Sequence, residues 1–198
     1  MDIIEKAIEF ARSVFAGDSG GHDFDHTMRV NRLAMRLAKA EGADLEIVSL
    51  AALLHDVDDR KLSPKTCENL GNARNFLHSH GVTADAAERI LHIISQVSFS
   101  GGKVPDTLEG KCVQDADRLD AMGAIGIART FAYGGSKGRR IYDPAGEDQT
   151  TSVQHFYDKL LLLKDRMNTQ TGRNLAQDRD AYLRSFLEEF YAEWDGLR

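Results

Sequence analysis

The sequence predicts an all-α protein. Apolar residues recur at helical spacing along almost the whole chain, and the alternation that marks half-buried strands is nearly absent. The segment 45–54 is apolar nearly all round, which is typical of a buried central helix. Three prolines and 17 glycines are spread along the 198 residues without a low-complexity tract, which excludes a collagen-like or disordered chain.

The expected helices follow from this spacing in order. The first sixteen residues form one amphipathic helix, with Ile4 and Ile8 on its apolar face. The next covers about 25–41, because an apolar stripe begins at Val30 and Gly42 ends the pattern. The central helix 45–54 runs directly into His55. Further helices, packed around the central one, are expected at 71–80, 84–95, 107–122 and 123–133.

The C-terminal part begins with a long connection at 134–150, which is predicted to be a mobile functional loop. Its basic cluster is either a solvated loop or a lid over a phosphate tail; it consists of Lys137, Arg139 and Arg140. Two last helices are expected at 153–167 and 174–194. No sharp break divides the chain, so we expect a single domain over 1–198, with a core at about 20–133 and C-terminal helices at about 151–196 packed on it.

Charge and cysteine usage narrow the function classes. Lys and Arg total 25 against 31 Asp and Glu, a formal charge of −6, which argues against a broad electrostatic grip on nucleic acid polymers or membranes. Cys67 and Cys112 form no disulfide framework, and the acidic N-terminal helix is not an export signal. No apolar stretch approaches the roughly 20 residues that span a bilayer. We expect a cytoplasmic protein.

Residues suited to metal binding occur at three places: His26, the pair His55-Asp56, and Asp117 in the acidic run 115–120. Each alone has an ordinary structural explanation as a hydrogen-bonded group. Together, two imidazoles and two carboxylates form a set suited to Mn, Fe, Co, Ni or Zn, whereas Ca or Mg sites are normally all oxygen. Around a divalent ion this set sums to zero charge, and octahedral geometry leaves positions for a water and a phosphoryl oxygen.

Acidic residues cluster around these motifs. Six carboxylates would repel one another and an anionic substrate unless a metal compensated them, so the clustering favours a metal site. The six are Asp56, Asp58, Asp59, Asp115, Asp117 and Asp120.

The same motifs carry a resemblance to a known family. His26, His55-Asp56 and Asp117 match the signature of the HD-domain metal-dependent phosphohydrolases, and the surrounding stretches resemble bacterial stand-alone hydrolases of about this size. The resemblance implies an HD-domain helical bundle and hydrolysis of phosphate esters or anhydrides, commonly in nucleotides. It also implies one divalent metal ion, manganese above all, with Ni, Co, Fe, Zn or Mg as alternatives.

Residue roles carry over from the resemblance. His26, His55, Asp56 and Asp117 become the metal ligands. Asp59 falls where related nucleotidases place an acid that handles protons; some relatives have Glu there, so the shorter Asp is expected to act through a water. In the implied mechanism, a metal-activated water attacks phosphorus after Asp59 takes or relays its proton.

Several residues are candidates for binding the phosphorylated small-molecule substrate. The basic ones are Arg29, Lys61, Arg118 and Lys159, the last mostly on the resemblance. His22, four residues before His26, is a further candidate, as a substrate contact or a partner of His26. The alternative for each is a solvated side chain or, for the basic ones, a pair with a nearby acid.

The histidines between the His-Asp pair and Asp117 allow a second metal ion, which would recruit His78, His80 or His92. We favour one metal, with His78 and His80 at a solvated helix end and His92 lining the pocket or core. The enzymatic runner-up is a phosphodiesterase or phosphomonoesterase, for example of cyclic nucleotides. The non-enzymatic alternative is a regulatory module that binds a metal but does not turn over a substrate. Asp59 argues against it, because a binding role would not need an acid that handles protons. The apolar run 160–163 is core or the seam of a homodimer.

Overall fold

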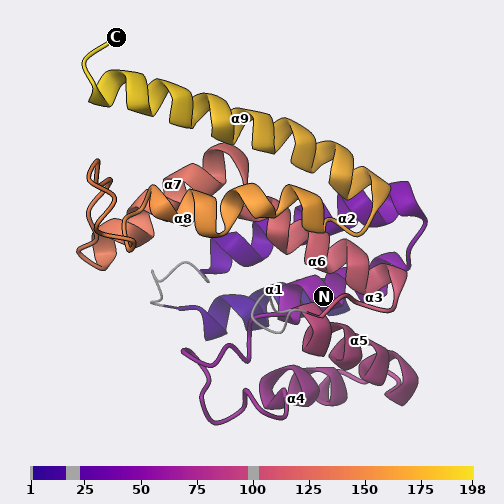
Figure 1. Ribbon diagram of the computed structural model, residues 1–198. Coiled ribbons are helices and arrows are strands. Elements are labelled where there is room, and N and C mark those ends of the chain that lie inside the picture. Colours follow the sequence, from indigo (N-terminus) through magenta and orange to yellow (C-terminus); the bar gives the residue numbers. More distant parts are fainter. Residues whose placement is uncertain (1, 17–22, 98–102) are drawn as a thin grey trace. The chain divides into compact units, whose positions relative to one another are not determined.

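The computed structural model describes residues 2–16, 23–97 and 103–198, and none of these residues lies in a strand. The predicted all-α fold is confirmed (Figure 1). The chain forms two compact units, one ending at Asp117 and the other beginning at Arg118. The first unit contains α1 (Ile3–Val14), α2 (Phe24–Glu41), α3 (Leu45–Leu54), α4 (Gly71–Ser79), α5 (Ala84–Val97) and most of α6 (Leu108–Asp120).

The second unit follows the end of α6. It contains α7 (Gly123–Ser136), α8 (Gln154–Asp158), the 3₁₀ turns η2 (Leu160–Leu162) and η3 (Lys164–Arg166), and α9 (Gln170–Trp194). No described helix combines the length and apolar character needed to cross a membrane. The expectation of a single domain, with the C-terminal helices packed on the core, stays a prediction.

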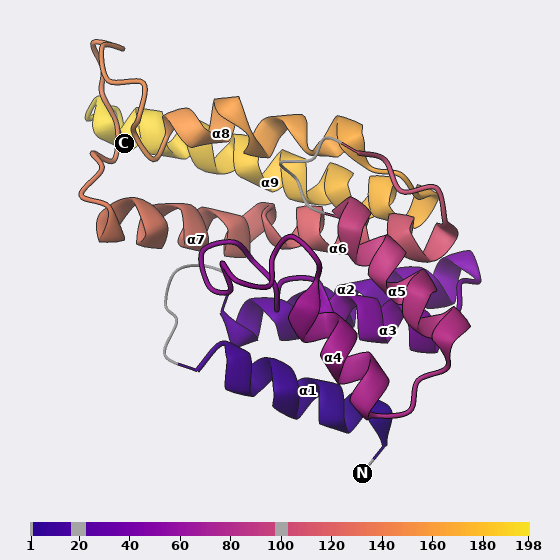
Figure 2. The same ribbon diagram turned by 90° about the horizontal axis from the view of Figure 1, so that it is seen from below.

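Helix α3 is the centre of the first unit. All eight residues from Ile47 to Leu54 are buried, which confirms the buried central helix expected from its all-round apolar sequence. Helices α1, α2 and α5 pack against it, and α4 packs on α5 (Figure 2). Each fully buried leucine contributes about 1.5–3 kcal/mol of transfer free energy, so the burial of α3 holds its C-terminal end in place.

Helix caps explain where α2 and α3 begin. Helix α2 begins at Phe24, one residue earlier than expected, because the side chain of Asp23 accepts the N–H of His26 at 2.6 Å. The side chain of Asp44 caps α3 in the same way by accepting the N–H groups of Glu46 and Ile47. The first cap places His26 in the first turn of α2.

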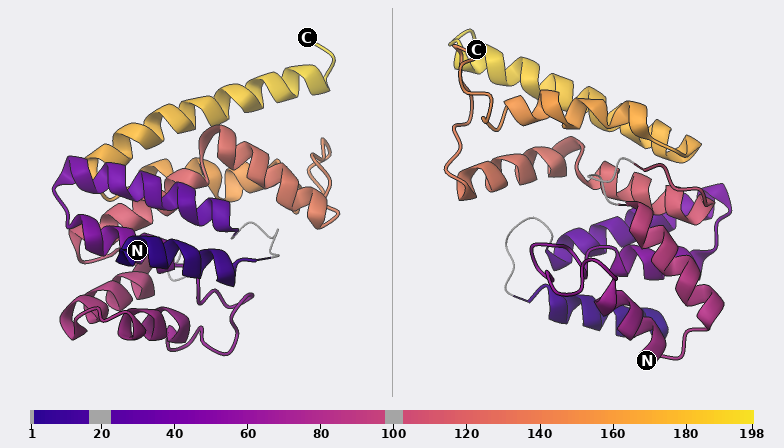
Figure 3. Two further views of the ribbon diagram at one scale, coloured as in Figure 1. Left: turned by 180° about the vertical axis from the view of Figure 1, so that it is seen from behind. Right: turned by 60° about the horizontal axis from the view of Figure 1, so that its bottom comes forward.

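The second unit departs from the expected boundaries. Helix α7 continues through Gly134 to Ser136, and a Cβ at Gly134 would lie 2.1 Å from Oγ of Ser152, so glycine allows this close approach. Helix α9 begins at Gln170 instead of 174, because Thr169 caps it by accepting the N–H of Gly172. It runs unbroken to Trp194 (Figure 3).

The helix expected at 153–167 is wrong as one element. It is divided into α8 and two 3₁₀ turns, because Lys159 leaves the helical region at φ −138° and ψ −59°. The loop before α8 is held by contacts among its own residues. The buried carboxylate of Asp143 accepts the N–H groups of Glu147 and Asp148 and lies 3.1 Å from Nη1 of Arg140. Arg140 of the predicted lid is thus engaged within the loop.

Two glycines of α7 give opposite predictions. A Cβ at Gly126 would lie 2.2 Å from the carbonyl oxygen of Ala121, whereas one at Gly135 would have nothing within 4 Å. We expect Gly126→Ala to lower the free energy of unfolding by about 2 kcal/mol or more through this clash. Gly135→Ala, the matched control, should raise it by about 0.5–1 kcal/mol through helix propensity. Urea unfolding of both variants measures the difference, and equal changes would contradict the packing at Gly126.

Candidate metal centre

The first group of the site comes from the start of α2. Because Asp23 caps the helix, His26 lies in its first turn, and its side chain is 1% exposed. Its Nε2 atom lies 3.5 Å from Oδ2 of Asp56 and 3.5 Å from Oδ1 of Asp117. The imidazole therefore faces two carboxylates that follow it by 30 and 91 residues in the chain.

The second group follows the end of α3. Nδ1 of His55 lies 2.8 Å from the carbonyl oxygen of Ala52. A carbonyl oxygen can only accept a hydrogen bond, so Nδ1 carries a hydrogen and is the donor. In the neutral ring this leaves the lone pair on Nε2, which lies 3.1 Å from Oδ2 of Asp56. The His55 side chain is only 4% exposed, and its buried Nε2 makes no hydrogen bond of good geometry.

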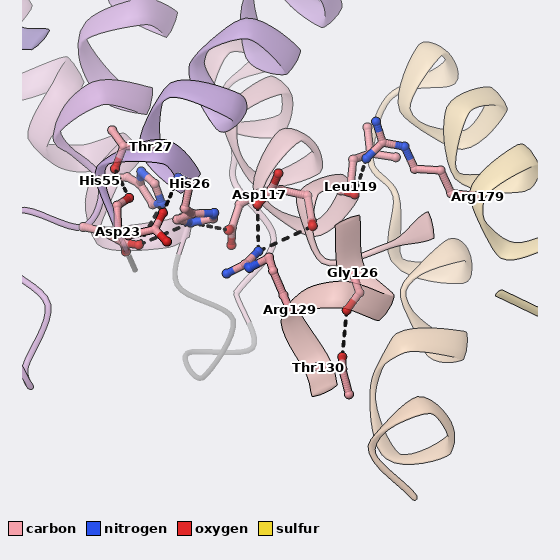
Figure 4. Close-up of polar contacts among 12 residues, drawn as sticks. Asp23, His26, Thr27, His55, Asp117, Leu119, Gly126, Arg129, Thr130 and Arg179 are labelled. Carbon is pink, nitrogen blue, oxygen red and sulfur yellow. Dashed lines mark hydrogen bonds and ion pairs between the residues drawn. The ribbon is translucent and has the colours of Figure 1, made fainter. Parts of the chain in front are cut away.

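The third group comes from α6. The side chain of Gln114 donates to the carbonyl oxygens of Gln96 and Lys103, which ties α6 to the end of α5. Asp117 lies one turn further along the same face. The structure thus brings together residues from α2, from directly after α3 and from α6, and Figure 4 draws His26, His55 and Asp117 pointing toward one another.

These side chains fit a divalent metal ion. One ligand atom each from His26, His55 and Asp117 lies within 4.8 Å of the others, and Asp56 contacts both imidazoles. Metal bonds of about 2.0–2.2 Å put neighbouring ligand atoms about 3–4 Å apart, and the distances of 3.1 and 3.5 Å between the imidazole nitrogens and the carboxylate oxygens fall in this range. The buried Nε2 of His55 supports the same conclusion, because a metal would satisfy its lone pair.

Without a metal, the site holds a proton instead. Burial lowers the pKa of His55, but the Asp56 carboxylate, with a smaller contribution from Asp117, outweighs burial and raises this pKa to about 9. The positive imidazolium then compensates the carboxylates that a divalent ion would otherwise neutralise. A metal that binds Nε2 must displace this proton.

Asp59 lies beside the metal centre, in the wall of a cavity of about 770 Å³ that His55 and Asp56 also line. Its Oδ1 accepts the backbone N–H of Lys61 at 2.9 Å, which orients the carboxylate. The cavity belongs entirely to the first unit, between the segment that follows α3 and helices α4 and α5. Its other lining residues are Asp58, Arg60, Cys67, Glu68, Asn69, Leu70, Arg74, Glu88, Leu91, His92, Ile94 and Ser95.

Two of the clustered carboxylates have structural partners. Asp58 accepts the backbone N–H groups of Asn72 and Ala73, both at 2.9 Å, and so anchors the start of α4. Asp120 lies 2.7 Å from Nη1 of Arg129 in the second unit. The expectation that all six carboxylates need a metal is therefore wrong for these two, which are compensated by N–H groups or a guanidinium.

Of the expected substrate contacts in the first unit, Arg29 lies one turn after His26 on α2 and is half-buried. Lys61 is exposed and does not line the cavity; its neighbour Arg60 does. Arg74 also lines the cavity, and its Nη1 lies 2.9 Å from Oε1 of Glu88. Sequence reasoning missed both arginines. Arg60 lies in an irregular segment without periodicity, and although Arg74 lies on α4, the helical pattern alone does not show that this side of α4 faces the cavity.

The other three candidates stay predictions, because two belong to the second unit and one lies outside the described residues. Arg118 is buried in the second unit, where its guanidinium donates to the carbonyl oxygen of Arg166. Lys159 ends α8, and its charge helps to lower the pKa of His155, after the larger effect of burial. His22 lies outside the described residues.

The additional histidines, His78, His80 and His92, have other surroundings or partners. His78 is exposed, and His80, at the end of α4, stacks on Phe76 and bonds to its carbonyl oxygen, which fits the expected helix end. His92 lines the cavity and pairs with Asp106 at 3.0 Å. Among the described residues, the set that could hold a metal does not include these three.

Metal binding at this centre should depend on pH. Because His55 holds a proton up to a pKa of about 9 and must lose it to coordinate, the apparent affinity for Mn²⁺ should rise about tenfold per pH unit between about pH 6 and 8. Calorimetry in buffers of different ionisation enthalpy should detect about one proton released per ion bound. An affinity that does not change over this range would contradict the geometry at His55.

Comparison with known proteins identifies the family. The HD domain model matches residues 23–122, a segment that contains the whole His-His-Asp group. The chain is 40% identical over 197 residues to the protein YpgQ of Bacillus subtilis (strain 168), covering 98% of this chain and 94% of YpgQ.

Solved structures agree with this match. An HD-superfamily hydrolase from Bacillus thuringiensis aligns with a TM-score of 0.81 and 44% identity, over 97% of this chain and 96% of that one. The crystal structure of Bacillus subtilis YpgQ in complex with ADP aligns with a TM-score of 0.82 and 36% identity, over 98% of this chain and 100% of that one. The chain therefore belongs to the HD-domain family and is related over nearly its full length to an HD-superfamily hydrolase.

Proposed function

We propose that this protein is a metal-dependent phosphohydrolase that cleaves phosphoester or phosphoanhydride bonds of nucleotides. The observation that carries the proposal is the convergence of His26, His55 and Asp117, with Asp56 against both imidazoles, at a cavity lined by Asp59. HD domains bind divalent metal ions, and the donor set suits one transition metal ion, for which we propose manganese.

The proposed ligands are the Nε2 atoms of His26 and His55 and the carboxylates of Asp56 and Asp117. A divalent ion held by them would polarise a phosphoryl oxygen and lower the pKa of a water. The two carboxylates neutralise its charge, so the site does not repel a phosphate group. The hydrogen bond from His55 to Ala52 holds one imidazole in the tautomer that coordination requires.

Asp59 is the proposed proton acceptor. Its Oδ1 already accepts the N–H of Lys61, so Oδ2 is the oxygen that would take a proton from the attacking water. A carboxylate beside a metal centre, but with an orientation set by a separate backbone contact, can accept a proton without leaving its position. This role distinguishes an enzyme from a module that only binds metal.

Two observations support nucleotides as the substrate class. The relative YpgQ has been crystallised with ADP and aligns with this chain over its full length. The cavity of about 770 Å³ falls within the range of about 300–1,000 Å³ typical of small-molecule sites. The test is an assay of the purified protein with Mn²⁺ against nucleoside mono-, di- and triphosphates and a cyclic nucleotide, with pyrophosphate and orthophosphate measured separately. Metal binding without turnover of any of them would contradict the proposal and favour a regulatory module.

Replacing a proposed metal ligand should remove both binding and turnover. We expect Asp117→Ala to lower Mn²⁺ affinity by about tenfold to a hundredfold and to reduce turnover below detection. The reason is that the one remaining carboxylate ligand neutralises only half of the charge of the divalent ion. Calorimetry and the nucleotide assay measure the two effects. Asp106→Ala, which alters an exposed carboxylate outside the metal group, is the matched control. Full activity of Asp117→Ala would overturn the ligand assignment.

Replacing the proton acceptor should separate binding from turnover. Asp59→Asn keeps the size of the side chain and an oxygen for the Lys61 N–H, but the amide cannot accept the proton. We expect a rate about 10²-fold or more below that of the unaltered protein, with unchanged Mn²⁺ stoichiometry. An unchanged rate would remove Asp59 from the mechanism.

A further inference from the structure

One residue in the wall of the cavity has an unusual backbone. Leu70, directly before α4, has φ 53° and ψ 44°, and it is the one non-glycine residue with positive φ in the part of the chain that the structure describes. This left-handed conformation brings Cβ close to the backbone and costs a residue such as leucine roughly 1–2 kcal/mol. A glycine would adopt it without strain.

The conformation of Leu70 is held from both sides. The two residues that flank Leu70, Asn69 and Gly71, both donate their N–H groups to the carbonyl oxygen of Thr66. On its C-terminal side, Asp58 accepts the N–H groups of Asn72 and Ala73. Because Asp58 lies two residues after Asp56, the residues that follow Leu70 are fixed to the segment of the metal motif.

The side chain of Leu70 explains why leucine is useful in a position that favours glycine. It is half-buried and lines the cavity that His55, Asp56 and Asp59 also line. Two apolar residues of α5, Leu91 and Ile94, line the same cavity. Strained conformations cluster where function requires a side chain in a fixed place, and here the strain adds an apolar surface to a cavity otherwise rich in charge.

We infer that Leu70 is a specificity-determining residue whose side chain packs against the nucleobase of the substrate. The inference rests on the proposed nucleotide hydrolase function and deepens it. A nucleobase is planar and largely apolar on its faces, whereas the phosphate groups need the metal and the charged residues. Leu70 therefore selects for nucleotides over substrates that have the phosphate chain alone.

The test compares a nucleotide with a probe that lacks the base. The experiment would measure kcat and KM for ATP and for inorganic tripolyphosphate, both with Mn²⁺. The proteins to be compared are the unaltered protein and the variants Leu70→Gly, Leu70→Asn and Leu70→Met. Glycine and asparagine tolerate the left-handed backbone but remove the apolar contact, whereas methionine retains an apolar side chain. Val104→Gly, which removes an exposed apolar side chain outside the cavity, is the control.

We expect Leu70→Gly and Leu70→Asn to raise KM for ATP about tenfold, with KM for tripolyphosphate and Mn²⁺ affinity unchanged. The melting temperature of Leu70→Gly should equal or exceed that of the unaltered protein, because the backbone strain is relieved. Leu70→Met and Val104→Gly should keep the original ratio of the two KM values. An unchanged ratio in Leu70→Gly, or an equal loss on both substrates, would overturn the inference while leaving the proposed function intact. If another nucleotide of the assay above is the better substrate, it replaces ATP in this comparison, and the phosphate compound without its nucleoside replaces tripolyphosphate. An unaltered protein that hydrolyses none of those nucleotides would overturn the proposed function, and this inference with it.

Discussion

The hydrogen bond between Nδ1 of His55 and the carbonyl oxygen of Ala52 is the contact on which the metal centre depends. It joins the most deeply buried helix of the first unit to the imidazole and leaves Nε2 as the atom that faces the carboxylates. Since α3 is buried over its last eight residues, the carbonyl of Ala52 has little freedom to move. The apolar core thus determines the direction of a metal-binding lone pair.

Charge compensation links the centre to the cavity. The same carboxylates that raise the pKa of His55 would neutralise a divalent ion, so proton and metal are alternative occupants of one electrostatic site. Asp58 lies only two residues from Asp56 but has a structural role, because its carboxylate oxygens accept hydrogen bonds from the N–H groups at the start of α4. One short acidic segment therefore serves both the metal centre and the wall of the cavity beside it.

The sequence was informative where periodicity or side-chain chemistry is local. The all-round apolar segment 45–54 predicted the buried helix, and the residue types at His26, His55-Asp56 and Asp117 predicted a group that the structure brings together. The strained backbone of Leu70 and the anchoring by Asp58 could not be predicted, because both depend on contacts across an irregular segment. The break at Lys159 was missed since its surroundings favour helix by composition.

Anomalous X-ray scattering from crystals grown with Mn²⁺ tests the proposed metal centre most directly, because it locates the ion without reference to activity. We expect one strong peak per chain within about 2.3 Å of Nε2 of both His26 and His55, with Asp56 and Asp117 completing the protein ligands. A peak bound elsewhere, or no peak while Mn²⁺ is present in excess over the protein, would contradict the assignment of this centre.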